Sequence, residues 1–123
     1  MRESKTIAVV GASPDPGRTS NRVMRYLQDA GYRCIPVNPN ADEVLGEQCY
    51  PSLRDVPEPV DFVDVFRRPE YCTSVAEEAV AVGTRALWLQ LGIRNPEARR
   101  IAEEAGLDYV EDACTLVVHR RLG

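Results

Sequence analysis

The chain has 123 residues, of which 44% are hydrophobic and 28% charged, values that are ordinary for a globular protein and exclude a disordered or low-complexity chain. A chain of this length folds as one domain, so we expect a single domain over residues 1–123. The formal net charge of -4 argues against nucleic acid as the main partner, because neutralising phosphates requires a net basic face.

Neither a membrane nor a metal is indicated as a partner. No apolar run approaches the roughly 18 residues that crossing a membrane requires, and residues 1–6 lack the apolar core of a secretion signal, so we expect a cytoplasmic protein without membrane contact. The four cysteines are widely spaced and form no C-x-x-C pair, and the sequence contains one histidine, His119. This spacing is not that of a zinc site, and we interpret the thiols as reduced.

The first predicted strand is Thr6–Val10, a continuous β-favouring run that Gly11 ends. Such a run is typical of a strand buried on both faces of a parallel sheet, and we expect it to be the central one. A Pro- and Gly-rich loop separates it from a helix with Val23 and Leu27 on one side and Gly31 as its stop. The candidate N-terminal caps of this helix are Thr19, Ser20 and Asn21.

The second predicted strand is residues 33–37, in which Pro36 lacks a ladder donor and so favours a position at the edge of a sheet. Residues 41–59 are expected to form a long connection with one short strand near Gln48–Tyr50. Further strands are predicted at residues 60–66, 85–91, 108–110 and 115–118.

Two more helices separate these later strands. Pro69 suits the first turn of a helix that runs to Val82, with Gly83 after it, and Asn95 is a predicted cap before Pro96 in a helix that ends at Gly106. Strands that alternate with helices predict an α/β fold, a Rossmann-like, doubly wound and mainly parallel sheet. Ligands of such sheets bind beyond the carboxyl ends of the strands, where the loops at residues 11–18, 38–40, 66–68 and 90–94 are expected.

The first loop has the composition of a phosphate site. Ser13 and Thr19 offer hydroxyl groups, Gly17 offers flexibility, and Arg18 offers positive charge beside a helix N-terminus. Backbone N–H groups and the helix dipole attract an anion at such a position, and arginine adds charge-assisted hydrogen bonds. The alternative is an ordinary turn between strand and helix, with capping residues only.

The dinucleotide fingerprint is incomplete in this loop. Ser13 occupies the position of the second glycine of G-x-G-x-x-G, and the second strand ends at Asn38 where an NAD site has an acidic residue. The Asn38-Pro39-Asn40 segment could frame a ribose or an adenine edge, or it could be a simple proline turn.

The third loop, Phe66-Arg67-Arg68, places an aromatic ring and two positive charges at the end of a strand. Unpaired charge is costly where it is buried, so a phosphate or an acidic side chain is expected to neutralise it. A solvated entrance to the next helix is the alternative.

Four segments, in order and spacing, resemble the stand-alone CoA-binding-domain proteins, which are similar to the CoA-binding domain of the succinyl-CoA synthetase α subunit. The segments are Val10–Ser13, Val37–Pro39, Asp64–Arg67 and Trp88–Ile93. The resemblance implies that Ser13 and Arg18 meet CoA phosphates. It implies that the adenosine portion and its phosphate are surrounded by Asn38, Pro39, Val65, Phe66 and Arg67, and that the pantetheine path is bordered by Gln90 and Gly92. With the loop residues, the predicted cofactor-binding set is Gly11, Ala12, Ser13, Arg18, Thr19, Asn38, Pro39, Val65, Phe66, Arg67, Gln90 and Gly92.

The sequence therefore predicts a small module that binds coenzyme A or an acyl-CoA without transforming it. No base stands beside a nucleophile in the pattern, and the chain lacks the second ligase domain with a phosphorylated histidine, so catalysis is not expected. Two alternatives remain open. One is an NAD(P)-binding redox sensor or enzyme fragment on the same fold, and the other is a CoA-binding interaction subunit of a separate acyl-CoA ligase.

Overall fold

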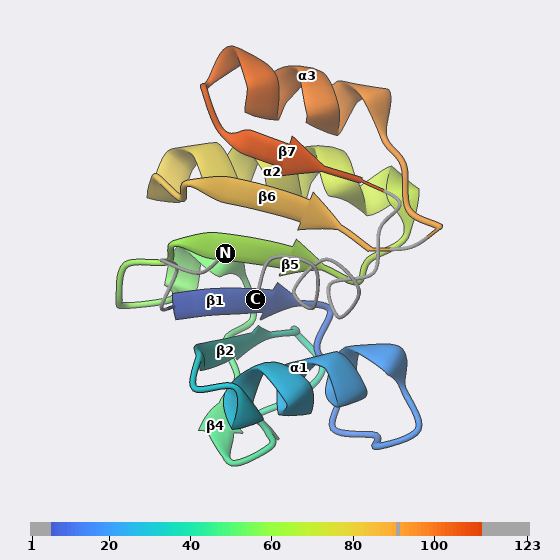
Figure 1. Ribbon diagram of the computed structural model, residues 1–123, viewed down its shortest axis with the longest axis vertical. Helices are drawn as coiled ribbons and strands as arrows, with labels where there is room; N and C mark the ends of the chain where they lie inside the picture. Colours follow the sequence, from blue (N-terminus) through green and yellow to red (C-terminus); the bar gives the residue numbers. More distant parts are fainter. Residues whose placement is uncertain (1–5, 91, 112–123) are drawn as a thin grey trace.

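The computed structural model describes residues 6–90 and 92–111, which form a five-stranded parallel sheet with helices on both faces (Figure 1). The strands in their spatial order are β2 (Arg33–Val37), β1 (Thr6–Val10), β5 (Phe62–Val65), β6 (Ala86–Leu89) and β7 (Asp108–Val110). The helices are α1 (Thr19–Asp29), α2 (Cys72–Val82) and α3 (Pro96–Glu104). The predicted fold class, a Rossmann-like α/β domain, is confirmed.

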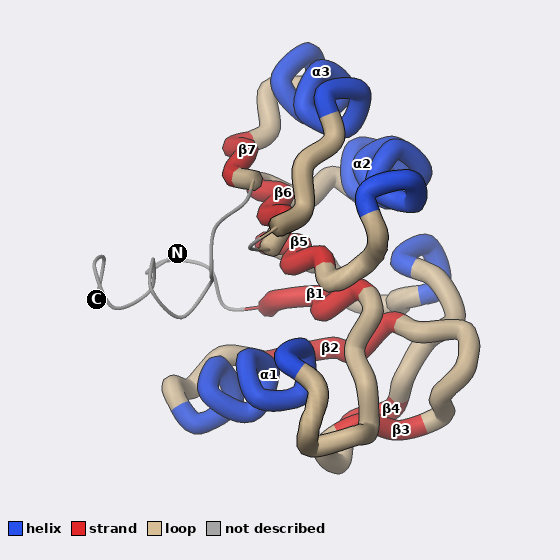
Figure 2. The backbone as a smooth tube through the Cα atoms, turned by 90° about the vertical axis from the view of Figure 1, so that its right-hand side faces the viewer, coloured by secondary structure: helices blue, strands red, loops and turns tan. Residues whose placement is uncertain are grey.

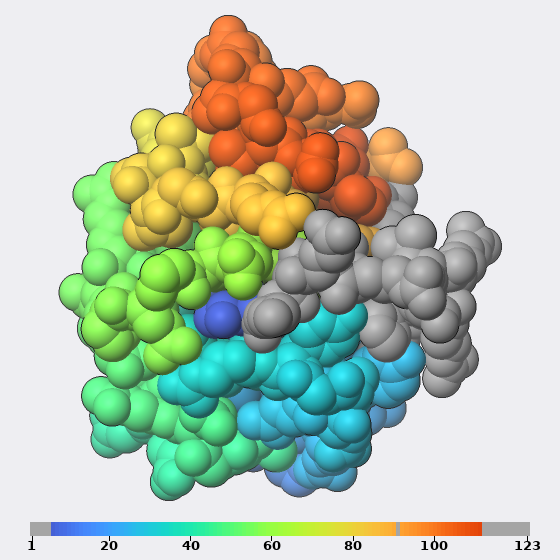
Figure 3. All heavy atoms as spheres, turned by 60° about the vertical axis from the view of Figure 1, so that its left-hand side comes forward, coloured from blue at the N-terminus to red at the C-terminus, as the bar shows by residue number. Residues whose placement is uncertain are grey.

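The sheet separates two apolar layers (Figure 2). Alternate residues of each strand point to opposite faces, so Val63 and Val65 pack toward α2 and α3 while Phe62 packs on the side of α1. Helix α1 contributes Val23, Met24 and Leu27 to its layer, the spacing of one helix face. The α1 end and the α3–β7 end lie at opposite ends of the long axis (Figures 1 and 3).

The strand expected at the centre, β1, is inner but not central, and β5 occupies the middle of the sheet. The chain leaves β1 through α1 on one face and leaves β5 through α2 on the other (Figure 2). Adjacent strands whose connections diverge in this way open a crevice at their carboxyl ends. The fold therefore places a crevice over the ends of β1 and β5.

The edge position predicted for the second strand is confirmed, since β2 is the outermost strand on its side. The carbonyl of Pro36 accepts a hydrogen bond from the N–H of Tyr50 at 3.1 Å, and the N–H of Asn38 donates to the Tyr50 carbonyl at 2.8 Å. Tyr50 thus forms a bridge to Val37 beside this edge.

The connection over residues 41–59 has more structure than the sequence predicts. It contains an antiparallel hairpin of β3 (Glu43–Val44) and β4 (Glu47–Gln48), followed by a 3-10 turn, η1 (Leu53–Asp55). Leu45 and Gly46 turn the hairpin with positive φ angles of 50° and 80°, which is why a glycine suits this position.

The start of α1 differs from the prediction. Arg18, not Thr19, Ser20 or Asn21, is the N-cap, and no side chain caps the helix. Ser20 and Asn21 are only 5% and 1% exposed, and neither side chain makes a capping hydrogen bond. The amide of Asn21 instead donates to the Ser13 carbonyl at 2.9 Å. Packing therefore overrides capping at this helix.

The other helix boundaries follow the prediction closely. Pro69 begins a 3-10 turn, η2 (Pro69–Tyr71), that leads into α2, and Gly83 ends α2 with a φ of 75°. Asn95 caps α3 by accepting a hydrogen bond from the Ala98 N–H at 3.0 Å. Within the described residues no helix is both long and apolar enough to cross a bilayer. The predicted strand at residues 115–118, and His119, lie outside the described residues.

Candidate functional site

Three hollows join into one groove across the carboxyl ends of β1, β2 and β5. The helix pocket, of about 360 Å³, is lined by Gly11, Ser13, Arg18, Thr19, Ser20, Asn38 and Phe66. The arginine pocket, of about 280 Å³, is lined by Gly11, Asn38, Asn40, Phe66, Arg67, Arg68 and Tyr71. The apolar pocket, of about 140 Å³, is lined by Val10, Val37, Pro39, Pro51, Ser52, Leu53, Arg67, Tyr71, Ser74, Val75 and Glu78. Shared lining residues place the arginine pocket between the other two.

The helix pocket has the features of an anion site. The first N–H groups of α1 open toward it without a capping side chain, and positive dipole charge concentrates at such an end. Arg18, at the N-cap, is exposed and has no carboxylate partner among residues 6–90 and 92–111. An uncapped helix end and an unpaired guanidinium therefore line the same hollow.

Hydrogen bonds within the first loop shape it in advance. The Ser13 hydroxyl oxygen accepts the Asp15 N–H at 3.1 Å, and an Asp15 carboxylate oxygen accepts the Gly17 N–H at 2.9 Å. The backbone N–H of Gly17 is therefore already bonded to the Asp15 carboxylate. An anion in the pocket would instead accept hydrogen bonds from the first N–H groups of α1. Ser13 keeps its hydroxyl proton for donation.

Among the residues that the structure describes, the buried side-chain oxygen of Asn21, under this loop, has no hydrogen-bond partner. Asn21 is 1% exposed, and its amide nitrogen holds the loop through the Ser13 carbonyl. Buried polar atoms without partners are uncommon in folded proteins.

Gly11 allows the first and third loops to touch. Its φ of 88° favours glycine, and a Cβ at this position would lie 2.8 Å from the carbonyl oxygen of Phe66 and 3.2 Å from Cδ of Arg67. The backbone after β1 thus packs directly on the backbone after β5, and this contact forms the floor shared by the helix and arginine pockets.

In the arginine pocket, the guanidinium of Arg67 lies over the ring of Tyr71, 4.6 Å from its centroid. The turn that carries Arg67 and Arg68 rests on the thiol of Cys72, which donates to the two arginine carbonyls at 3.9 and 3.5 Å. Burial raises the pKa of this thiol to about 11, so it stays protonated at neutral pH.

Asn38 holds the opposite wall of the arginine pocket. Its side-chain amide donates to the Ala12 carbonyl at 2.7 Å, and its side-chain oxygen accepts the Asn40 N–H at 2.9 Å. One side chain therefore links the loop after β2 to the loop after β1. This role explains why an amide, rather than a carboxylate, suits the position, since only an amide can donate to a carbonyl.

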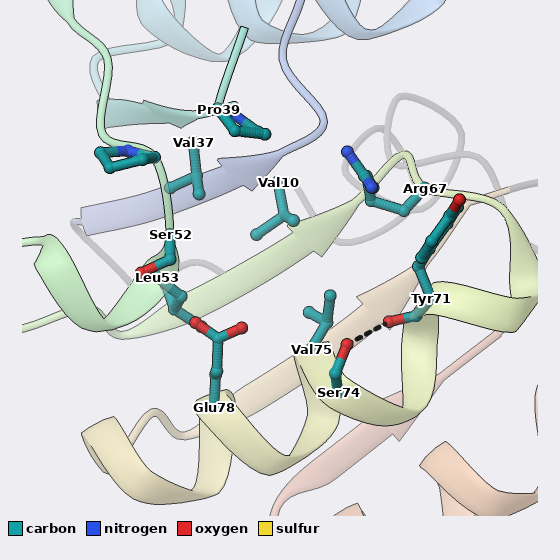
Figure 4. Close-up of a pocket in the computed structure, with 11 residues that line it drawn as sticks. Val10, Val37, Pro39, Ser52, Leu53, Arg67, Tyr71, Ser74, Val75 and Glu78 are labelled. Atoms are coloured by element: carbon teal, nitrogen blue, oxygen red, sulfur yellow. Dashed lines mark hydrogen bonds between the residues drawn. The ribbon is translucent and has the colours of Figure 1, made fainter.

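The apolar pocket lies between the ends of β1 and β2 and the face of α2 (Figure 4). Val10 and Val37 come from the strand ends and Val75 from the helix, while Ser52 and Glu78 lie on one side of the pocket and Arg67 and Tyr71 on the other (Figure 4). An apolar interior with a polar rim is typical of pockets that bind a flat, partly polar ring.

Most of the predicted site residues meet in the groove. Those that line it are Gly11, Ser13, Arg18, Thr19, Asn38, Pro39, Phe66 and Arg67. Ala12 and Val65 are both 0% exposed, so their side chains lie in the core. Gln90 is 4% exposed and its amide donates to the buried carboxylate of Asp64. Gly92 is exposed and lines none of the three pockets.

Sequence reasoning missed the contribution of α2 to the groove. The residues that line the apolar pocket from this side are Tyr71, Ser74, Val75 and Glu78. Their spacing is i, i+3, i+4 and i+7, which marks one face of a helix and was a usable signal. Ser52 and Leu53 belong to the long connection, where no pattern pointed to a ligand.

Comparison with known proteins gives a consistent result. The profile described as CoA binding domain matches residues 5–120. The uncharacterized protein YneT of Bacillus subtilis is 44% identical over 97% of this chain and 88% of its own length. A hypothetical protein from Pyrococcus horikoshii superposes with a TM-score of 0.95 at 44% identity, covering 99% of this chain and 87% of the other.

Larger enzymes share the domain. The ADP-forming acetate–CoA ligase I of Archaeoglobus fulgidus is 30% identical over 96% of this chain, which spans 19% of that ligase. A dinucleotide-forming acetyl-coenzyme A synthetase from Ca. Korarchaeum cryptofilum, solved with phosphate and ADP, superposes with a TM-score of 0.78 at 28% identity, over 88% of this chain and 26% of the synthetase. The groove, the fold and these similarities agree, and the chain belongs to the CoA-binding domain family.

Proposed function

We propose that this protein binds coenzyme A or an acyl-CoA in the groove and does not transform it. The observation that carries the proposal is the uncapped N-terminus of α1 beside the unpaired Arg18, because together they supply N–H donors and positive charge for a diphosphate. Membership of the CoA-binding domain family supports the choice of nucleotide.

The remaining parts of the groove fit the adenosine end of such a ligand. The apolar pocket, with its valine walls, suits a purine ring, and Asn38, Pro39, Phe66 and Arg67 lie between it and the helix pocket. Ala12 and Val65 act in this proposal through backbone and packing, since both side chains are buried. In this proposal Gln90 and Gly92 border the pantetheine path. The buried Gln90 amide is bonded to Asp64, so Gln90 would position the loop and not contact the ligand with its side chain.

We also propose a cytoplasmic location for the protein, which its free thiols support. Within the described residues Cys34, Cys49 and Cys72 are all unpaired and buried. Their burial raises the pKa of each thiol, to about 12 for Cys34 and about 11 for Cys72. These cysteines are suited to packing and not to nucleophilic chemistry, which agrees with a binding role.

Isothermal titration calorimetry of the whole chain with CoA tests the proposal. We expect saturable binding, and a gain of about 2.7 kcal/mol in the free energy of unfolding at 100 times Kd. Arg18→Ala should weaken CoA binding about 10- to 100-fold, because one charge-assisted hydrogen bond to phosphate contributes roughly 1.5–3 kcal/mol. Arg99→Ala is the matched control, because Arg99 lies on α3 with Glu103 3.4 Å away.

Two results would overturn the proposal. One is the absence of heat and of thermal stabilisation with millimolar CoA. The other is tighter binding of NADH or NADPH than of CoA in parallel titrations, which would favour a redox role on the same fold. Equal weakening by Arg18→Ala and Arg99→Ala would locate the ligand elsewhere on the chain.

A second role follows from the ligases that contain this domain. Because the chain aligns with 19% of the Archaeoglobus enzyme, it could present CoA to a separate partner that carries the remaining ligase domains. Affinity purification of the tagged chain from its native cells, with and without CoA, should then recover a partner with acyl-CoA ligase activity. Recovery of no such activity would remove this second role and leave CoA binding unaffected.

A further inference from the structure

The side chain of Asn95 makes more hydrogen bonds than capping α3 requires. Its oxygen accepts the Ala98 N–H at 3.0 Å, which is the capping bond. Its amide nitrogen donates to the Pro69 carbonyl at 2.7 Å and to the Thr73 hydroxyl oxygen at 3.1 Å. Pro69 begins η2 and Thr73 lies in the first turn of α2, so one side chain joins the start of α3 to the start of α2.

The turn that Asn95 holds, residues 67–72, carries side chains of the groove, and we call it the arginine turn. Arg67 and Tyr71 line both the arginine pocket and the apolar pocket, and Arg68 lines the arginine pocket. The Arg67 guanidinium lies 4.6 Å from the centroid of the Tyr71 ring. Tyr71 is two residues after Pro69, so the position of the Pro69 carbonyl sets where the ring lies, and the ring in turn orients the guanidinium.

Hydrogen bonds within the arginine turn close it, and the bond from Asn95 ties it to a distant part of the chain. The Tyr71 N–H donates to the Arg68 carbonyl at 2.9 Å. The Cys72 thiol, a weak donor, donates to the Arg67 and Arg68 carbonyls at 3.9 and 3.5 Å. Asn95 lies 26 residues beyond the carbonyl that it holds, so it fixes the turn relative to the loop after β6.

We propose that Asn95 is a positioning residue for the CoA site, because its amide holds the arginine turn where Arg67 and Tyr71 meet a ligand. This inference rests on the proposed function. Asn95 lines none of the three pockets, so it acts on the ligand only through the turn. It is anchored by its own carbonyl, which accepts the Arg99 N–H at 3.0 Å and the Tyr109 hydroxyl at 3.5 Å. The loops after β5 and β6 therefore form one unit.

Two substitutions of Asn95 separate positioning from capping. Aspartate and serine both cap helices well, but a carboxylate cannot donate to a carbonyl and the serine side chain is too short to replace the amide. Calorimetric titration of the whole chain should show CoA affinity about 3- to 10-fold weaker in Asn95→Asp, the range expected for one neutral hydrogen bond. Asn95→Ser should show the same loss, which would exclude the added negative charge as its cause.

Ile101→Val is the matched control for stability. Ile101 is a half-buried residue of α3 that packs on the core, and its shortening should lower the melting temperature without touching the arginine turn. CoA affinity should be the same in Ile101→Val as in the wild-type protein. Loss of stability in α3 alone therefore cannot imitate the expected effect of the Asn95 variants.

Two further measurements ask whether Asn95 acts through the turn. In an Arg67→Ala background, Asn95→Asp should change CoA affinity by less than about 2-fold, because the guanidinium that the turn positions is already gone. Without ligand, the Tyr71 N–H should exchange with solvent several-fold faster in Asn95→Asp than in the wild-type protein, as followed by NMR, and at the wild-type rate in Ile101→Val.

Three results would overturn the inference while the proposed function stands. They are unchanged CoA affinity in Asn95→Asp, an equal loss of affinity in Ile101→Val, and full additivity of Asn95→Asp with Arg67→Ala. Absence of CoA binding by the wild-type protein would instead refute the proposed function.

Discussion

One arginine and one glycine at the amino end of the parallel sheet have surroundings that differ from those of matched residues at its carboxyl end. At the amino end, Arg33 pairs with Glu47 at 2.6 Å and with Glu58 at 3.0 Å, and Gly31 has no atom within 4 Å of the place its Cβ would take. At the carboxyl end, Arg18 and Arg68 have no carboxylate partner in the part of the chain that the structure describes, and Gly11 is in tight contact with the next loop.

If the proposed function is right, this difference separates charge that serves solubility and local stability from charge that serves a ligand. A paired arginine on the surface is solvated and contributes little free energy. An unpaired arginine in a hollow, beside backbone held tightly in one conformation, is a preorganised anion donor. The predictions below test the contrast between the two ends.

The largest effect is expected from Gly11→Ala. The new Cβ would meet the Phe66 carbonyl oxygen at 2.8 Å and would also strain a φ of 88°. Overpacking and strain together should lower the free energy of unfolding by about 3 kcal/mol or more. Urea unfolding measures this loss, and CoA titration should show a further loss of affinity.

Gly31→Ala is the control at the amino end. Its φ of 97° is equally unfavourable for alanine, but its Cβ would be in open space, so only the backbone strain of about 1 kcal/mol should appear. Similar losses in the two variants would show that the contact between the loops after β1 and β5 is not tight in solution.

An intermediate effect is expected from alkaline pH, through one buried thiol toward each end. Burial raises the pKa of Cys34, on β2, to about 12 and that of Cys72, under the Arg67–Arg68 turn, to about 11. The unfolded chain releases these protons near pH ~8.5 and the folded chain retains them, so the unfolded state binds fewer protons above that pH and stability falls.

Between pH 8 and pH 10 the free energy of unfolding should therefore decrease, by on the order of 2 kcal/mol for each thiol. Chemical denaturation at the two pH values measures the change. Cys34→Ala and Cys72→Ala should each remove its own share of the pH dependence, which would show that both thiols are kept protonated by burial. If the double variant keeps the full dependence, groups other than these thiols cause it.

The smallest effect is expected from Arg33→Met at the amino end. The side chain of Arg33 is 49% exposed, so the loss of its two ion pairs should cost less than about 1 kcal/mol. Arg33 lowers the pKa of Glu58, so the wild-type advantage should vanish as the pH falls through that lowered pKa. Thermal unfolding with added salt should narrow the difference between the two proteins, and CoA affinity should not change. A weaker affinity would contradict the division between the two ends.

The sequence predicted the strands of the parallel sheet and most helix boundaries, because Gly, Pro and Asn act locally through backbone geometry. Gly83 and the Asn95 cap are examples, and both are where they were predicted. At the start of α1 the predicted caps were wrong. Ser20 and Asn21 are residue types that often cap helices, but tertiary packing buries both of them, and a local sequence pattern does not reveal that packing.

The candidate site could be predicted at the level of its loops but not of its side chains. Ala12 and Val65 belong to segments that border the groove, yet both side chains lie in the core, because apolar layers cover both faces of the sheet. Tyr71 and Glu78 enter the groove only because α2 lies beside the long connection after β2. That contact between distant segments depends on tertiary packing, which the sequence pattern did not express.

The proline in β2 has a consequence for how copies of this protein can associate. The carbonyl of Pro36 faces outward, where the N–H of Tyr50 already occupies it, and proline has no N–H to offer beside it. A strand from another molecule would find one acceptor taken and one donor missing at this position. Strand addition is therefore disfavoured at the Pro36 end of the β2 edge, which limits how a second copy of this protein can lengthen the sheet on this side.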